Sequence, residues 1–264
     1  MAASASSLQI ARVRNRSVVT GARSATPLRL LSPAGDGDAA WVYQSSLGGG
    51  FVGGDEVALR VDVAVGASLF LSSQASSKVY RGARSAFALD ATVADGATLV
   101  SWPDPVVCFA GAAFDQQQRF ALARTASLVA VDAWTAGRIA CGERWTFDRL
   151  ATRLALAIDG EPVLDDAMLL SRAHGDLGSR LGAHGAFATI VLAGPRLAGA
   201  CDRVGAQIAA RPLGSPLVTA SRWPWGLVIR LAAAAGEPLA REARDLLREH
   251  VIALLSADPW ARKW

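Results

Sequence analysis

Alternating hydrophobic and polar positions dominate the first two thirds of the chain. Between residues 57 and 65 every odd position is apolar, and Arg60 and Asp62 lie between them. Residues 87–93 and 150–158 follow the same rule with few exceptions. A period of two places the apolar side chains on one face of a β-strand. We therefore predict strands over 57–65, 87–93 and 150–158, and further strands over 8–13 and 28–31.

A short segment of the sequence recurs at a regular interval. Val-Gly-Ala-Ser-Leu at 65–69 returns as Asp-Gly-Ala-Thr-Leu at 95–99 and, more weakly, as Thr-Ala-Ser-Leu at 125–128. A turn of small residues followed by a strand, repeated at nearly constant spacing, is typical of β layers that stack on one another. The middle of the chain is therefore predicted to form stacked, β-helix-like layers.

Helical periodicity is confined to the last third of the chain. Apolar residues spaced by three or four positions predict one helix over 195–211 and a second over 238–257. Short apolar runs at 217–219 and 227–229 predict two strands between these helices. The Gly- and Arg-rich stretch 173–185 is expected to be a mobile loop. The prediction is a mainly β chain, a single domain over 1–264 of stacked antiparallel and mixed layers with two helices.

Composition agrees with a folded protein. The 264 residues are 52% hydrophobic and 19% charged, and no apolar run reaches the ~18 residues of a membrane span. Three scattered cysteines do not form a disulfide framework and favour a reducing compartment. Cys108 and Cys141 lie in or beside strand patterns, so both are expected to be buried thiols.

Positive charge is concentrated at the start of the chain. Five arginines precede the first acid, Asp36, although the net charge of the whole chain is only +4. An acid-free, Ser-rich opening is also a feature of organelle transit peptides, but the strand pattern at 8–13 favours a structural role. The remaining charges alternate in sign, which disfavours nucleic-acid binding.

None of the short motifs defines an active site. Residues 48–54 contain G-x-G-x-x-G, but the pattern opens a strand rather than a helix, so a sharp turn is the better interpretation. His174, Asp176 and His184 share one stretch without metal-ligand spacing, and solvent exposure is the expected fate of that group. The residues alone leave a small-molecule hydrolase or a ligand-binding module on a β scaffold as alternatives.

Several segments in fixed order do resemble a known family. The chain has Gly-Gly-Gly-Phe-Val-Gly-Gly-Asp at 48–55, Leu-Ser-Ser-Gln-Ala-Ser-Ser-Lys-Val-Tyr-Arg at 71–81 and Pro-Asp-Pro-Val-Val-Cys-Phe at 103–109. Val-Asp-Ala-Trp-Thr-Ala-Gly-Arg at 131–138 and Gly-Glu-Arg-Trp at 142–145 follow. Together they resemble the urease accessory protein UreD (UreH) family, with serines at 72 and 73 where that family usually has threonines. The matching motif residues are Gly53, Gly54, Asp55, Gln74, Lys78, Tyr80, Arg81, Pro103, Asp104, Pro105, Gly137, Arg138, Gly142 and Glu143.

The resemblance implies a non-enzymatic scaffold in the cytoplasm. Members of the family form a β-rich stack with two helices, bind UreF, and through UreF the GTPase UreG. The assembly docks on apo-urease and helps to load nickel. No tightly bound cofactor, nucleic acid or membrane is implied, and nickel would be held only in transit.

Two groups of residues follow from this resemblance as candidates. A transient nickel path is expected to use oxygen ligands near the shared motifs, namely Asp55, Gln74, Asp104 and Glu143, because a conduit must release its ion. Trp260, Arg262 and Trp264 in the C-terminal tail are candidates for partner contact, since aromatic and arginine side chains are enriched at interface hot spots.

Overall fold

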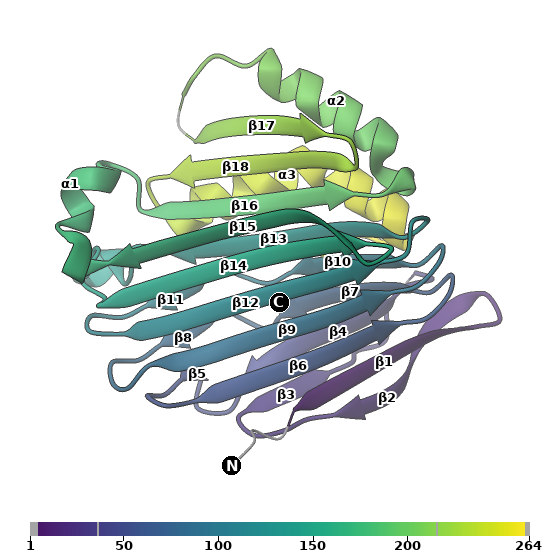
Figure 1. The fold of residues 1–264 in the computed structure, drawn as a ribbon, viewed down its shortest axis with the longest axis horizontal. Coiled ribbons are helices and arrows are strands. Elements are labelled where there is room, and N and C mark those ends of the chain that lie inside the picture. The colour runs from purple at the N-terminus through teal and green to yellow at the C-terminus, as the bar shows by residue number, and fades with distance from the viewer. Residues whose placement is uncertain (1–4, 36, 215, 262–264) are drawn as a thin grey trace.

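Two large β-sheets face each other in the computed structural model of the chain, which describes residues 5–35, 37–214 and 216–261 (Figure 1). Within these residues one sheet has seven strands and the other eleven. The seven-stranded sheet consists, in spatial order, of β15 (Glu161–Ser171), β14 (Arg149–Ile158), β12 (Ala113–Leu122), β9 (Ser85–Val93), β6 (Glu56–Val63), β1 (Ser6–Val13) and β2 (Arg16–Arg23).

The eleven-stranded sheet lies behind it and carries the helices. Its main path consists of β17 (Leu217–Trp223), β18 (Gly226–Ala233), β16 (Ala186–Ala193), β13 (Ser127–Thr135), β10 (Thr98–Trp102), β7 (Ser68–Ser73), β4 (Ala40–Ser46) and β3 (Leu28–Leu31). Three short strands join it at one end: β5 (Gly50–Phe51), β8 (Lys78–Val79) and β11 (Val106–Cys108).

The repeated segment of the sequence marks successive turns of a parallel coil. Ser68, Thr98 and Ser127 lie side by side on β7, β10 and β13, which pair in parallel. On the other sheet β6, β9 and β12 are also parallel neighbours. Each repeat therefore contributes one strand to each sheet, as in a β-solenoid. The prediction of a mainly β chain with stacked, mixed layers is confirmed.

The predicted strands agree with the structure within a few residues. The pattern at 57–65 corresponds to β6, that at 87–93 to β9 and that at 150–158 to β14. The early strands at 8–13 and 28–31 correspond to β1 and β3, and the runs at 217–219 and 227–229 belong to the longer β17 and β18. The strand interpretation of the arginine-rich start is thus confirmed.

Apolar side chains fill two separate layers. Leu99 and Leu128 point between the two sheets, whereas their neighbours Val100 and Val129 point toward the helices. Both faces of β10 and β13 are therefore buried, and these strands are buried along their whole length rather than at every second residue. The seven-stranded sheet has one buried and one exposed face, which explains why its strands alternate.

Two long helices cover the outer face of the larger sheet. α2 (Ala198–Ala209) follows the short 3-10 turn η3 (Pro195–Leu197), and α3 (Gly236–Leu255) has Pro238 in its first turn. Both predicted helices, 195–211 and 238–257, are confirmed with slightly shifted ends. α3 buries one continuous apolar stripe consisting of Leu239, Ala243, Leu246, Leu247, Val251, Leu254 and Leu255.

The stretch 173–185 contains a third helix that the sequence interpretation missed. The short helix α1 (Leu177–Leu181) follows the 3-10 turn η2 (Arg172–His174). The Asp176 carboxylate caps α1 by accepting hydrogen bonds from the backbone N–H groups of Gly178 at 3.2 Å and Ser179 at 2.9 Å. The prediction of a mobile loop over 173–185 was therefore wrong in its loop part at residues 177–181, because the glycine and arginine content obscured a cap residue.

One of the thiol predictions was also wrong. Cys108 is buried on β11, as expected, but Cys141 is exposed. β13 ends at Thr135, and the chain leaves the sheet to form the 3-10 turn η1 (Ile139–Cys141) at the surface. In the described part of the chain, no helix is long and apolar enough to cross a membrane.

Candidate functional site

A cavity with a mixed polar and apolar lining lies between the two sheets, near the end that carries β5, β8 and β11. Its volume is 230 Å³. Hydroxyl, amide and carboxylate groups make up its polar lining, with apolar walls from Phe51, Phe87 and Leu89. The polar lining residues are Gln44, Ser45, Ser46, Ser73, Gln74, Ser76, Ser77, Ser101, Asp104, Gln116 and Gln118.

Two of the nickel-path candidates from the sequence, Gln74 and Asp104, line this cavity together. Gln74 is exposed, so the cavity is accessible from solvent on its side. Ser73 connects the two turns, because its Oγ accepts a hydrogen bond from the backbone N–H of Asp104 at 2.8 Å. Burial, and to a smaller extent the charge of Asp104, raises the pKa of the Tyr43 phenol.

A buried carboxylate lies behind the deep wall of the cavity. Gln116 lines the cavity and donates its Nε2 hydrogen to Asp132 Oδ1 at 2.7 Å. Asp132, on β13, is the only acidic residue that is buried among those the structure describes. Burial raises its pKa to about 6, although hydrogen bonds from Thr152 and Gln116 favour the charged form.

The polar groups continue past Asp132 toward the far edge of the seven-stranded sheet. Asp166 on β15 contributes to the raised pKa of Asp132 by repulsion. Its carboxylate accepts hydrogen bonds from Thr189 Oγ1 at 3.2 Å and from the Arg230 guanidinium at 2.6 Å. A series of oxygen-bearing side chains therefore extends through the interior from Asp104 to the surface pair of Asp166 and Arg230.

One amide that lines the cavity lacks a hydrogen-bond partner in the protein. Gln118 is 2% exposed, and its Nε2 is buried without a partner. An unpaired buried amide is costly, and such groups usually bond to water or a ligand. The unpaired Gln118 amide therefore favours a cavity that contains water or a polar ligand.

The other two nickel-path candidates do not line the cavity. Asp55 accepts a hydrogen bond from the backbone N–H of Val52 at 2.7 Å and so closes the Gly-rich turn. Glu143 forms an ion pair with Arg138 and accepts a hydrogen bond from the Ala110 N–H at 3.2 Å. These bonds, led by the one from Arg138, lower the pKa of Glu143. The Asp55 carboxylate is thus bonded within its own turn, whereas Glu143 bonds within its own turn and to the turn of Ala110.

Several shared motif residues meet in a cluster around Phe109. The Arg138 guanidinium lies 4.2 Å from the centre of the Phe109 ring, and the Tyr80 ring packs edge-on against it at 5.1 Å. Gly137 has φ +117°, and a Cβ there would lie 3.0 Å from the carbonyl oxygens of Cys108 and Glu143. The cluster joins three successive turns of the coil, which indicates a structural role for these motif residues.

The remaining motif residues are spread over the same end of the coil. Gly54 donates its N–H to the Ala83 carbonyl at 3.2 Å, which joins two neighbouring turns. Pro103 lines the cavity, and Pro105 is half-buried next to it. The other four, Gly53, Lys78, Arg81 and Gly142, are exposed.

The C-terminal tail packs on the larger sheet as far as it is described. The Trp260 ring lies edge-on to Trp102 with 5.0 Å between centres, and also contacts Phe70 at 6.4 Å. Trp260 is half-buried by these contacts. Arg262 and Trp264, the other candidates for partner contact, lie outside the described residues.

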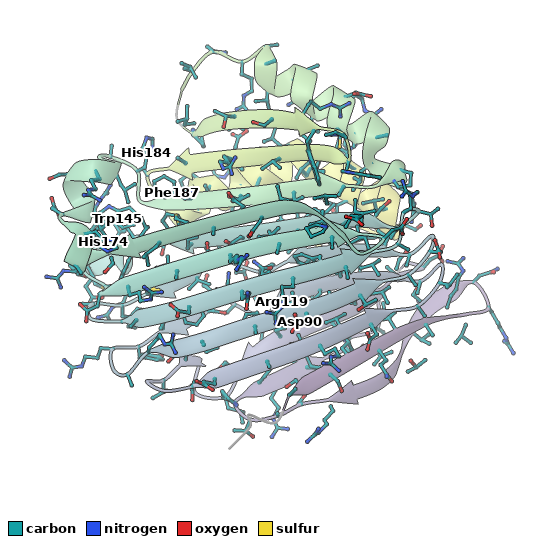
Figure 2. The ribbon with its side chains drawn as sticks, viewed as in Figure 1. Asp90, Arg119, Trp145, His174, His184 and Phe187 are labelled. Atoms are coloured by element: carbon teal, nitrogen blue, oxygen red, sulfur yellow. The ribbon has the colours of Figure 1, made fainter. Side chains whose placement is uncertain are left out.

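The histidines do not build a metal centre in the described part of the chain, where no three His, Cys, Asp or Glu side chains come close enough to hold an ion. Figure 2 shows His174 and His184 at the end of the molecule beside α1, together with Trp145 and Phe187. His184 packs on Phe187 with 6.0 Å between ring centres, and His174 is exposed. Asp176, the third member of that group, caps α1.

Comparison with known proteins identifies the class. The family described as UreD urease accessory protein matches residues 3–263. A urease accessory protein UreD of Sorangium cellulosum is 46% identical over 97% of this chain and 83% of its own length. One from Anaeromyxobacter is 44% identical over 98% and 89%, and urease accessory protein D of rice is 33% identical over 74% and 67%. The relatives are thus urease accessory proteins of bacteria and plants.

The chain belongs to the UreD family, as its sequence motifs suggested. The match covers nearly the whole chain, including the C-terminal third where the motifs were thin. Sequence reasoning missed Asp132, Gln116 and Gln118 as interior polar groups. The available signal was the period of two, since these three side chains share their strand face with buried apolar neighbours such as Phe120 and Ala130.

Proposed function

We propose that this chain is a non-catalytic urease maturation scaffold of the cytoplasm. In this proposal it binds UreF, reaches the GTPase UreG through UreF, docks on apo-urease and helps nickel enter the urease active site. Family membership supports the link to urease maturation. No tightly bound cofactor, nucleic acid or membrane takes part in this proposal.

The observation that carries the nickel role is the donor set of the inter-sheet cavity. Its polar lining consists of carboxylate, amide and hydroxyl groups, and its lining residues include neither histidine nor cysteine. Oxygen donors bind a divalent first-row ion more weakly than a cage of imidazoles and thiolates. A cavity of this kind suits an ion that must be passed on, with nickel as cargo rather than as a resident cofactor.

The proposed path enters at Gln74, passes Asp104 and reaches Asp132 through the Gln116 wall. Asp104 and Asp132 supply negative charge at two depths, and the unpaired Gln118 amide lies in the cavity between the two sheets. Asp55 and Glu143 are peripheral to this path because their carboxylates are bonded within surface turns. Trp260, Arg262 and Trp264 remain the proposed partner contacts of the tail.

The alternative functions rest on the same cavity but lack a catalytic pair there. A hydrolase needs a nucleophile within hydrogen-bond reach of a base. The serines at the cavity mouth have no histidine among the lining residues. A ligand-binding module would use the Gln118 amide to hold its ligand. This alternative would be supported if the chain bound a ligand and had no effect on urease. The family match favours the scaffold.

The test is urease maturation with and without this chain. Apo-urease is co-expressed with UreF, UreG and either the wild-type chain, Asp104→Ala or the matched surface variant Asp165→Ala. Asp165 lies on the exposed face of β15 in an ion pair with Arg153. We expect omission of the chain and Asp104→Ala to lower the nickel content of urease, and Asp165→Ala to leave it unchanged.

Binding to UreF must be measured in the same samples by co-purification. If Asp104→Ala binds UreF normally and urease still loads fully, the cavity is not the nickel path. If urease loads fully without the chain, the maturation role itself is wrong. Asp55→Ala and Glu143→Ala serve as further controls, and we expect them to affect loading only as far as they lower the amount of folded protein.

A further inference from the structure

The arginine-rich start of the chain has no role in the function proposed above. Arg12, Arg14, Arg16, Arg23 and Arg29 are all exposed on β1, β2, β3 and the turns beside them. No acid precedes Asp36, which lies outside the described residues. In the part of the chain that the structure describes, none of these five arginines forms an ion pair.

Most arginines elsewhere on the same sheet, though not Arg60 on β6, form ion pairs with acids on neighbouring strands in the described residues. Arg119 on β12 forms an ion pair with Asp90 on β9, in the middle of the seven-stranded sheet (Figure 2). Arg153 pairs in the same way with Asp165 on β15. The first strands therefore depart from the pattern of this sheet. Arg12 donates a hydrogen bond to the Gly66 carbonyl and Arg16 to the carbonyls of Gly35 and Gly37, whereas Arg14 and Arg23 donate none within the described residues.

The unpaired arginines flank a strand edge. β2 is the last strand of the seven-stranded sheet in the described residues, and its only neighbour there is β1. Figure 1 shows the β1–β2 hairpin at the rim of the molecule, projecting beyond the other strands. β2 has eight residues, with Arg16 and Arg23 at its two ends. The Ser17 N–H donates to the Asp38 carbonyl at 2.7 Å, so the first part of this edge is occupied by the chain itself. The remaining edge runs from Val18 to Arg23, about 20 Å at ~3.3 Å per residue.

Apolar side chains are exposed beside these charges. Val13 is 51% exposed and Val18 is 37% exposed, and Leu31 on β3, the next strand along the chain but part of the other sheet, is 42% exposed. Arginine combined with apolar contact area is the composition of protein interfaces, whereas single-stranded nucleic acid needs aromatic platforms for its bases. The residues of this hairpin, 6–23, include no Phe, Tyr or Trp.

We propose that the β2 edge binds an extended acidic segment of a partner protein as an additional strand. The backbone of β2 from Val18 to Arg23 supplies hydrogen bonds, Arg14 and Arg23 bind carboxylates near the two ends, and Val18 contacts an apolar side chain between them. The competing role of such arginines is to guard the edge against self-association. Preventing self-association requires only the charge of the arginines, whereas binding a partner strand also requires backbone hydrogen bonds along the β2 edge.

The test uses the whole chain and a defined probe. The probe is a fluorescent peptide of about ten residues with alternating Glu and Val, matched to the length of an edge strand. Binding is measured by anisotropy for the wild type, for Arg14→Asn/Arg23→Ser and for the control Arg180→Ser/Arg203→Ser. The control arginines are exposed, lie outside the first sheet strands and form no ion pair in the described residues.

We expect the Arg14/Arg23 variant to bind the probe about fivefold more weakly, because two exposed charge contacts are lost. The control variant should bind like the wild type. A peptide N-methylated at alternate residues, which cannot pair along one edge, should also lose affinity. Neither substituted residue donates a hydrogen bond within the described chain, so the variant should retain its fold, which circular dichroism checks.

Several results would overturn the proposal. If both double variants bind the peptide equally well, Arg14 and Arg23 do not contribute to the site. If the N-methylated peptide binds as tightly as the unmodified one, the peptide does not pair with the strand edge. Tighter binding of an oligonucleotide than of the acidic peptide points to nucleic acid instead. If the wild type does not bind the peptide and the Arg14/Arg23 variant self-associates in size-exclusion chromatography, the arginines only prevent self-association at this edge.

Discussion

Replacing Asp132 by Asn should stabilise the protein at neutral pH. Burial raises the pKa of Asp132 from its ordinary value of 3.8 to about 6, so the folded state disfavours the charged carboxylate. Between pH 4 and pH 7 this rise in pKa lowers the free energy of unfolding of the wild type by at most about 3 kcal/mol. Asn has nearly the same shape, carries no charge and keeps an oxygen that can accept the bond from Gln116.

The sign of the pH dependence follows from the direction of the shift. A carboxyl group whose pKa is raised by folding contributes its full stability below the unfolded value, and loses that contribution as pH rises through about 6. Wild type and Asp132→Asn should therefore be equally stable near pH 4. Their difference should grow between pH 4 and pH 6 and level off at higher pH, with the variant more stable.

The assay is urea denaturation of both proteins at a series of pH values, followed by circular dichroism. Other groups titrate equally in both proteins, so the difference in unfolding free energy isolates Asp132. An Asn variant that is less stable at pH 7, or whose advantage does not change with pH, would refute the reasoning. Loss of nickel loading by this more stable variant would indicate that the buried charge is kept for function.

Three further outcomes test the local structure. Gly137→Ala should lower the free energy of unfolding by about 1–3 kcal/mol in thermal denaturation, because residue 137 has a φ of +117° and a Cβ there would lie 3.0 Å from two carbonyl oxygens. The control Gly205→Ala, within α2, should leave stability unchanged or raise it. In the native protein a thiol reagent should modify Cys141 quickly and the two buried cysteines only on unfolding. Trp260→Ala should lower stability by about 2 kcal/mol and change the near-ultraviolet dichroism, because Trp260 packs on Trp102.

The sequence predicted one sheet better than the other, for a physical reason. The seven-stranded sheet has an exposed outer face, so its buried residues alternate with polar ones and the strands can be recognised. β10 and β13 are covered on both faces, so their buried residues do not alternate with exposed polar ones and no period of two identifies the strands. The recurring Gly-Ala-Ser/Thr-Leu turn identified the parallel stacking of those strands instead.

α1 could not be found by periodicity because five residues hold barely one helical turn. Its signal is Asp176, whose carboxylate accepts two backbone N–H bonds, and which the sequence interpretation considered only as a metal ligand. A single Asp fits a cap, a turn or a ligand equally well in sequence. The bonds it makes in the folded chain decide between these roles.

Position in the fold separates two kinds of residue within the family motifs. Arg138 and Glu143 form an ion pair at a surface turn, and Asp55 closes its own turn, so these side chains stabilise the coil. Gln74 and Asp104 instead line a cavity. The Asp104 carboxylate also has a partner, because it accepts a hydrogen bond from Ser73 Oγ at 3.4 Å, so its place in the cavity lining is what distinguishes it from Glu143. This position makes Asp104 the stronger choice than Glu143 for a test of nickel transfer.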